Sequence, residues 1–199
     1  MKFLKENSYD IVKLFINQVG ITIFSLILYT SVDMIKTNGE SLPLVVDVLI
    51  SVLSTLFYFA LLYTAAWDWG AKDKIRIDGG RLERDTFKGM KMSITANAIN
   101  FFLAAGCVIF MGIHLASDSA LMNTLFFIFN LILRLIAAMY IGLLQGIFYF
   151  AASDEYLYFF YQSIGYLVVP IFAVLVTHMG YCFGLKEKKI FPSAKSKKQ

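Results

Sequence analysis

The sequence predicts an all-α, multi-pass bundle of transmembrane helices, and two observations carry that prediction. First, the 199 residues are 58% hydrophobic and only 16% charged, whereas soluble domains have about 25% charged residues. Second, the charges cluster and leave five apolar windows with at most one charge each: 14–32, 48–67, 92–117, 119–153 and 156–185. About 20 apolar residues cross a bilayer as a helix. We therefore expect a single integral membrane domain, residues 1–199, with about five spans.

The first three spans follow in chain order. The first covers about 11–32 and is an anchor rather than a cleaved signal, because Tyr29-Thr30-Ser31-Val32 offers no small-residue cleavage site. The second covers about 43–66 and the third about 89–115. The one long hydrophilic stretch, 67–88, connects the second span to the third.

The fourth and fifth predicted spans are about 119–150 and 163–185, and a basic tail, 186–199, follows. The fourth window would form a helix of about 48 Å at 1.5 Å per residue, which is long for one upright span and short for two. Arg134 interrupts it near the middle. Two alternatives therefore stay open: one principal helix, or a re-entrant or hairpin pair that is broken near Arg134.

Basic residues near the span ends predict that the N-terminus and the loop 67–88 are cytoplasmic. Three lysines precede or begin the first span, and seven basic residues lie in or just after that loop, whereas the first loop has only Lys36. The six lysines of the tail favour the cytoplasmic side. A chain with a cytoplasmic N-terminus and five spans would place the tail on the opposite side. A re-entrant fourth segment would return the tail to the inside, so its side stays open.

Arg134 is the most informative residue, because a guanidinium in hydrocarbon costs about 2.5–3.5 kcal/mol and usually faces a protein interior or a wet cavity. Asp47 is its best partner by charge, and the side-chain carbonyl of Asn97 or Asn100 is the alternative if Arg134 lies deeper. A structural pair and a substrate-binding arginine are equally compatible with this position. Ordinary helix packing through small and polar residues is the competing explanation. The candidate binding residues in this polar interior are Arg134, Asp47, Asn97, Asn100, Asn130 and Gln145.

The loop 67–88 supplies a candidate docking surface for a membrane or cytoplasmic protein partner. Its tryptophans fit an interfacial belt, and Asp78-Gly79-Gly80 predicts a tight turn inside a small hairpin or a hooked loop. Its mixed charge suits docking, although a solvated connector is the more common explanation for such a loop. The candidate docking residues are Trp67, Trp69, Arg76, Arg81 and Arg84.

No motif in the sequence predicts catalysis, and we expect neither an enzyme nor a bound cofactor. His-Glu-x-x-His and Gly-x-Ser-x-Gly are absent. His114 and His178 belong to different predicted helices, so no metal site is predicted. The formal charge of +4 reflects topology and contact with the lipid bilayer rather than a nucleic-acid partner.

Three stretches resemble small bacterial multi-pass membrane proteins without an assigned function: 69–73 with 88–91, 130–142, and Gly180-Tyr181-Cys182-Phe183-Gly184. The resemblance covers about half of the chain, places it in a bacterial cytoplasmic membrane and transfers no functional residue. Two hypotheses about function follow from the sequence. The first is an accessory or interaction subunit of a membrane complex that docks through 67–88. The alternative is a small transporter or ligand-capturing membrane protein whose polar interior centres on Arg134.

Overall fold

A computed structural model describes residues 2–34, 44–149 and 154–188. All regular structure in these residues is helical, which confirms the predicted all-α class. The elements in chain order are α1 (Lys2–Met34), α2 (Leu44–Asp78), α3 (Lys88–Ala96), α4 (Ala98–Ser117), α5 (Ala120–Ile136), the 3₁₀ turn η1 (Ala138–Tyr140), α6 (Ile141–Phe148) and α7 (Glu155–Leu185).

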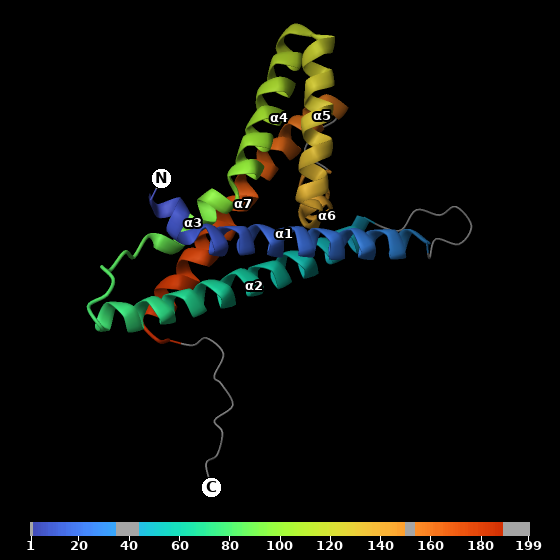
Figure 1. Cartoon of the computed structure of the whole chain (residues 1–199). Coiled ribbons are helices and arrows are strands. Elements are labelled where there is room, and N and C mark those ends of the chain that lie inside the picture. The colour runs from blue at the N-terminus through green and yellow to red at the C-terminus, as the bar shows by residue number, and fades with distance from the viewer. Residues whose placement is uncertain (1, 35–43, 150–153, 189–199) are drawn as a thin grey trace.

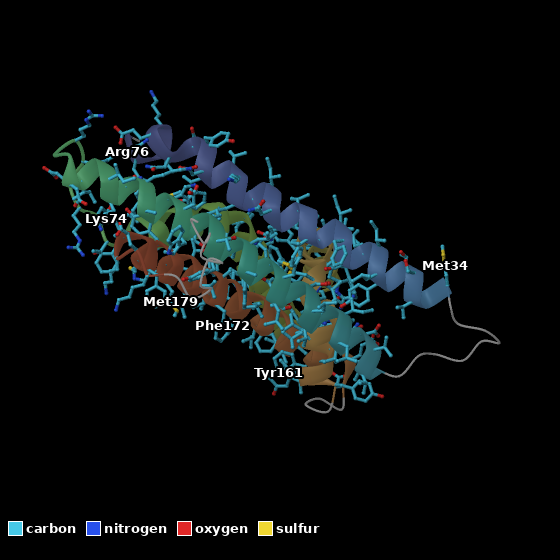
Figure 2. All side chains as sticks on the ribbon, turned by 90° about the horizontal axis from the view of Figure 1, so that it is seen from below. Met34, Lys74, Arg76, Tyr161, Phe172 and Met179 are labelled. Carbon is cyan, nitrogen blue, oxygen red and sulfur yellow. The ribbon has the colours of Figure 1, made fainter. Side chains whose placement is uncertain are left out.

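The helices form two groups that α7 joins (Figure 1). α1 and α2 run side by side, and α4 and α5 form a hairpin that is steeply inclined to them. α7 packs against both α2 and α4. From below, α1, α2 and α7 lie alongside one another, with Lys74 and Arg76 at one end and Met34 at the other (Figure 2).

The outer surface of the bundle is apolar. Ile16, Leu53, Phe102, Leu131 and Phe172 are all more than half exposed, although contiguous exposed apolar surface is rare on soluble monomers. In the described ranges, α1, α2, α4 and α7 are each long and apolar enough to cross a bilayer, and the α5–α6 pair makes a fifth span if it is counted as one. The structure is thus a helical bundle of the membrane type.

α2 and α7 approach each other where glycines leave room for the opposite backbone. A Cβ atom at Gly184 would overlap the carbonyl of Trp67, and one at Gly180 would lie 2.6 Å from the carbonyl of Tyr63. Small residues four positions apart allow this close approach between membrane helices. The C-terminal end of α7 is therefore packed directly against the second half of α2.

Several helices extend beyond the predicted spans, because polar residues continue a helix past its apolar window. α2 runs on to Asp78, and an ion pair of 2.6 Å between Asp68 and Lys72, one turn apart, lies on this extension. α7 begins at Glu155 instead of 163, after an N-cap in which Asp154 accepts a hydrogen bond of 3.4 Å from the Leu157 N–H.

The hairpin alternative for 75–83 is wrong, and the hooked loop is the observed structure. Ile75 and Ile77 belong to α2. The glycine pair ends this helix: Gly80 has φ of 68°, and its N–H donates to the Ile77 carbonyl at 2.9 Å. The predicted third span is also interrupted, since α3 and α4 meet at Asn97. The loop at 35–43, Phe150 and the tail from Lys189 lie outside the described residues.

Candidate functional site at a helix break

The long fourth window folds as a broken pair of helices. α5 and α6 are bent by 91° relative to each other, and η1 forms the corner. The break is at Ala137, three residues after Arg134. The single straight helix is therefore wrong, and the broken alternative is the one that the structure has.

Side chains of α1 and α2 bind the backbone groups that the break releases. A helix end inside an apolar environment leaves carbonyl groups that need a donor. The Ile136 carbonyl accepts from the Thr22 hydroxyl at 2.7 Å and from Nε2 of Gln18 at 3.3 Å. The Met139 carbonyl accepts from the Thr55 hydroxyl at 3.4 Å. The polar residues of α1 and α2 thus stabilise the corner between α5 and α6.

Tyr29 fixes the beginning of α6. Its hydroxyl accepts from the Gly142 N–H at 3.0 Å and lies 2.5 Å from the Ser51 hydroxyl and 3.3 Å from the Asp47 carbonyl. Position 142 has no space for a side chain, because a Cβ atom there would overlap the Asp47 carbonyl. The start of α6 is therefore held against the first turn of α2 and the last part of α1.

Arg134 binds a neutral partner rather than either of the predicted ones. Its Nη2 donates to Oε1 of Gln162 in α7 at 2.7 Å, and the guanidinium lies 5.8 Å from the centre of the Phe159 ring. Among the described residues, no ion pair includes Arg134, and Asp47 is not its partner. The Nε of Arg134 is buried and has no hydrogen-bond partner.

Asn97 and Asn100 instead support the helix break indirectly, through Gln18 of α1. Nδ2 of Asn100 donates to Oε1 of Gln18 at 2.9 Å and to Oδ1 of Asn97 at 3.0 Å. Nδ2 of Asn97 in turn donates to the Ser93 carbonyl at 3.0 Å. This chain orients Gln18, which then binds the Ile136 carbonyl. The two asparagines contribute to the architecture of the site, and their side-chain bonds go to Gln18, Ser93 and each other rather than to Arg134.

The remaining predicted binding residues divide between the two helices of the pair. Asn130, one turn before Arg134, is 5% exposed, and its Nδ2 has no partner. Gln145 lies half-buried on α6, where its backbone carbonyl accepts from the Tyr149 N–H at 2.8 Å. Asn130 therefore shares the face of Arg134, whereas Gln145 lies beyond the corner.

Residues of α7 that the sequence analysis did not single out complete the surroundings of Arg134. Gln162 is fully buried, and its Nε2 donates to the Tyr158 hydroxyl at 3.4 Å. One turn further on, Tyr166 is 1% exposed and its hydroxyl has no partner. A fifth span that starts at 163 left Gln162 outside the membrane. The four-residue spacing of 158, 162 and 166 is the signal that would have found this face.

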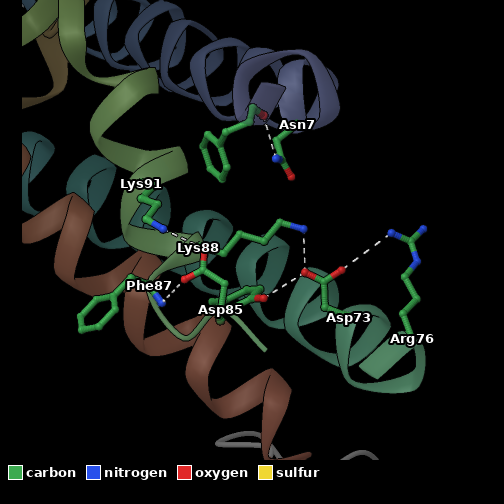
Figure 3. Close-up of polar contacts among 9 residues, drawn as sticks. Asn7, Asp73, Arg76, Asp85, Phe87, Lys88 and Lys91 are labelled. Atoms are coloured by element: carbon green, nitrogen blue, oxygen red, sulfur yellow. Dashed lines mark hydrogen bonds and ion pairs between the residues drawn. The ribbon is translucent and has the colours of Figure 1, made fainter. Parts of the chain in front are cut away.

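A second polar cluster lies at the end of the bundle that carries the loop between α2 and α3, which we call the loop end (Figure 3). Asp73 is 3% exposed and accepts from Nζ of Lys88 at 2.7 Å and from the Tyr181 hydroxyl at 2.9 Å. Nη1 of Arg76 lies 3.8 Å from its other oxygen. The cluster connects the end of α2, the start of α3 and the last turns of α7.

The hooked loop 79–87 is held in place on both sides. Asp85 forms an ion pair of 2.9 Å with Lys91, and the Phe87 ring stacks on His178 with ring centres 5.8 Å apart. A pocket of about 680 Å³ lies between this loop, the first turns of α1 and the end of α2, and its lining includes both basic and acidic side chains.

The predicted docking residues are spread over this end of the bundle. Trp69 and Arg76 line the pocket, and Trp69 is only 6% exposed, so it packs inside rather than forming a lipid-facing belt. Nε1 of Trp67 donates to the Lys188 carbonyl at 2.8 Å. Arg81 and Arg84 are exposed on the hooked loop.

Comparisons with protein families, curated proteins and solved structures give no match for this chain. Its function has therefore to be inferred from its own residues. The two polar centres, at the helix break and at the loop end, are the starting points.

Proposed function

We propose that this protein is a small transporter or ligand-capturing membrane protein, which binds a solute at Arg134 beside a re-entrant α5–α6 segment. The observation that carries the proposal is the charge of Arg134, which has no acidic partner in the described part of the chain. An uncompensated charge inside a membrane protein marks a binding or transport site by default.

Both helices of the α5–α6 pair contact the first half of α7, which supports re-entry. In the first half of α5, Phe126 lies against Phe159, with ring centres 5.8 Å apart. At the end of α6, Phe148 stacks on Tyr161 at 6.4 Å. A pair that enters and leaves on one side of the bundle, opposite to the Asp73 cluster at the other end of α7, would make both of these contacts.

Re-entry also resolves the charge conflict in the sequence. With four crossing helices, the N-terminus, the loop 67–88 and the tail all face one side. This arrangement gathers the three basic residues of the N-terminal side, the seven of the second loop region and the six of the tail, and leaves Lys36 alone on the other side. Such a distribution is the one that the positive-inside rule favours, so we propose that both termini are cytoplasmic.

The interactions of Arg134 within the protein stabilise its charge without neutralising it, and the hydrogen bond to Gln162 contributes about 1.5–3 kcal/mol. Arg134 lies in the last turn of α5, where the helix dipole favours a cation by about 0.3–1 kcal/mol, and the Phe159 ring adds about 0.5–2 kcal/mol. These interactions offset much of the insertion cost of about 2.5–3.5 kcal/mol. An apolar residue would avoid that cost altogether, so the retained charge favours a functional role.

Solute-dependent thermal stability of the full-length protein in lipid nanodiscs tests the proposal. The panel consists of sodium acetate, sodium bromide, glycine, choline gluconate and urea in a sodium gluconate buffer. A solute at one hundred times its Kd stabilises by about 2.7 kcal/mol, which raises the unfolding midpoint by about 5 °C or more. We expect at least one solute to do this in the wild type and in Arg84→Gln, which removes an exposed arginine, but not in folded Arg134→Gln. Equal shifts in all three proteins, or none, would contradict a site at Arg134.

The fixed position of the hooked loop 79–87 favours a second candidate function, an accessory subunit that docks a protein partner. Asp73, Asp85 and Phe87 hold the hooked loop against α2, α3 and α7, and Arg81 and Arg84 are exposed on it. A loop with fixed geometry loses less conformational freedom on binding. The charged pocket beside it would accept a segment that carries charges of both signs.

Co-purification from native membranes tests the second candidate. Arg81→Glu/Arg84→Glu is expected to lose a stoichiometric partner that Lys186→Glu/Lys188→Glu retains, because the control makes the same charge change at two exposed positions of the same end. If both double variants retain the partner equally, the hooked loop is only a connector.

A further inference from the structure

We propose that the solute at Arg134 is a small monovalent anion, bound by Arg134, Asn130 and Tyr166. This inference rests on the proposed function and adds the chemical class of the ligand. The evidence is the type of polar atom that the site leaves unpaired.

Three buried polar atoms without a partner belong to Arg134 itself and to residues one turn from Arg134 or from its partner Gln162, and each of them can donate a hydrogen bond. They are Nε of Arg134, Nδ2 of Asn130 and the hydroxyl of Tyr166. Both Asn130 and Tyr166 are at least 95% buried. An unsatisfied buried donor costs about 1–3 kcal/mol, so an acceptor that the protein itself does not supply would remove this cost along the two facing helices.

The three residues lie on helix faces that meet. Asn130 and Arg134 are one turn apart on α5, and Gln162 and Tyr166 are one turn apart on α7. The bond from Arg134 to Gln162 joins these two faces. α4 packs against both of these helices. An acceptor beside the guanidinium would therefore lie between α5 and α7, with α4 alongside.

The charge of the ligand follows from the charge of the site. Arg134 supplies a single positive charge, and no carboxylate of the described chain forms an ion pair with it. A monovalent anion would neutralise this charge, whereas a divalent anion would leave one negative charge unpaired in a low-dielectric interior. A neutral solute would leave the guanidinium uncompensated. Halides and small carboxylates share the required chemistry.

Anion titrations of the full-length protein in nanodiscs made of zwitterionic lipid test this inference. Sodium gluconate is replaced by sodium bromide, acetate or sulfate at constant ionic strength, and the unfolding midpoint gives each Kd. We expect bromide or acetate to stabilise the wild type more than folded Arg134→Gln, whereas sulfate, which stabilises proteins without a binding site, should shift both proteins equally. The stronger of bromide and acetate identifies a halide or a carboxylate site. Tyr166→Phe and Asn130→Leu should each raise that Kd about tenfold, since one donor to an anion contributes about 1.4 kcal/mol.

Tyr9→Phe is the matched control, because it removes the same hydroxyl group from a side chain that is 78% exposed. Its Kd should equal that of the wild type. An unchanged Kd in both Tyr166→Phe and Asn130→Leu would overturn the anion site. Arg134-dependent stabilisation by glycine, choline or urea, without any by anions, would overturn the anionic class and leave the proposed solute site intact. The absence of any Arg134-dependent solute would overturn both proposals.

Discussion

The guanidinium of Arg134 donates to the side-chain carbonyl of Gln162 at 2.7 Å across 28 positions of sequence. This bond joins α5 to α7 just before the corner at which the chain turns towards α6. Gln162 is fully buried. A buried amide thus orients a buried charge without neutralising it, and the site keeps a net positive charge.

Two replacements of Gln162 distinguish its role in orienting Arg134 from the effect of the uncompensated charge of Arg134. Gln162→Leu removes the acceptor of Arg134 and is expected to lower the free energy of unfolding by about 1.5–3 kcal/mol, the contribution of a hydrogen bond to a charged group. Gln162→Glu keeps the shape and supplies a carboxylate, so it should retain stability while the built-in negative charge replaces the anion. Thermal unfolding of both variants in nanodiscs with and without bromide measures these effects. If Gln162→Glu responds to bromide as the wild type does, the guanidinium does not bind the anion.

The proposed re-entry of α5–α6 predicts that both flanks of this segment are accessible from one side of the membrane. Single cysteines are introduced as Ser117→Cys, Ser153→Cys, Arg84→Cys and Ser196→Cys after both native cysteines are replaced by serine or alanine. Membrane-impermeant maleimide applied to intact cells should label the first two positions, and inverted vesicles should expose the last two. A full crossing by the pair predicts instead that Ser117→Cys and Ser153→Cys are labelled from opposite sides.

The sequence predicts the helical class and the five apolar windows, because the hydropathy of a segment depends only on the side chains of that segment. It raises a break near Arg134 as one of two alternatives but does not fix the corner at Ala137, since neither proline nor glycine is present there. The corner depends on Thr22, Gln18 and Tyr29, which bind its backbone groups from α1. Such contacts join residues more than a hundred positions apart and leave no local signal.

The partner of Arg134 escaped prediction for a related reason. Pairing with Asp47 requires the two residues to lie close together, but the Asp47 carbonyl lies against Gly142 at the start of α6, beyond the corner, whereas Arg134 precedes the corner. Gln162 lies inside the uncharged window 156–185, but the predicted span began only at 163, whereas the N-cap at Asp154 starts the helix at Glu155. Helix ends follow capping and turn chemistry, whereas hydropathy reports only the apolar centre.

The contact between α2 and α7 predicts that glycine is required at position 184. Gly184→Ala places a methyl group on the Trp67 carbonyl, and separating the two helices should cost about 1–3 kcal/mol of unfolding free energy. Gly20→Ala on α1 is the matched control, because nothing lies within 4 Å of the added methyl group. It should leave stability unchanged or raise it by up to about 1 kcal/mol. Unfolding in denaturant compares the two, and equal stability would mean that close packing at Gly184 contributes little.

The Asp73–Lys88 ion pair predicts an asymmetry between single and double substitutions. The two side chains are 4% and 16% exposed, so Asp73→Leu leaves a largely buried ammonium without its counterion and should cost about 3–5 kcal/mol of unfolding free energy. Tyr181→Phe removes only one hydrogen bond to Asp73 and should cost about 1 kcal/mol.

Asp73→Leu combined with Lys88→Met should recover most of the loss, because apolar residues of similar size replace a buried pair at little cost. Thermal unfolding of the single and double variants measures their coupling.

The same variants distinguish stability from docking. If the hooked loop recognises a partner through its geometry, the stable double variant still loses that partner, because a directional ion pair no longer holds the loop. A double variant that regains both stability and partner binding would show that the pair contributes only to folding.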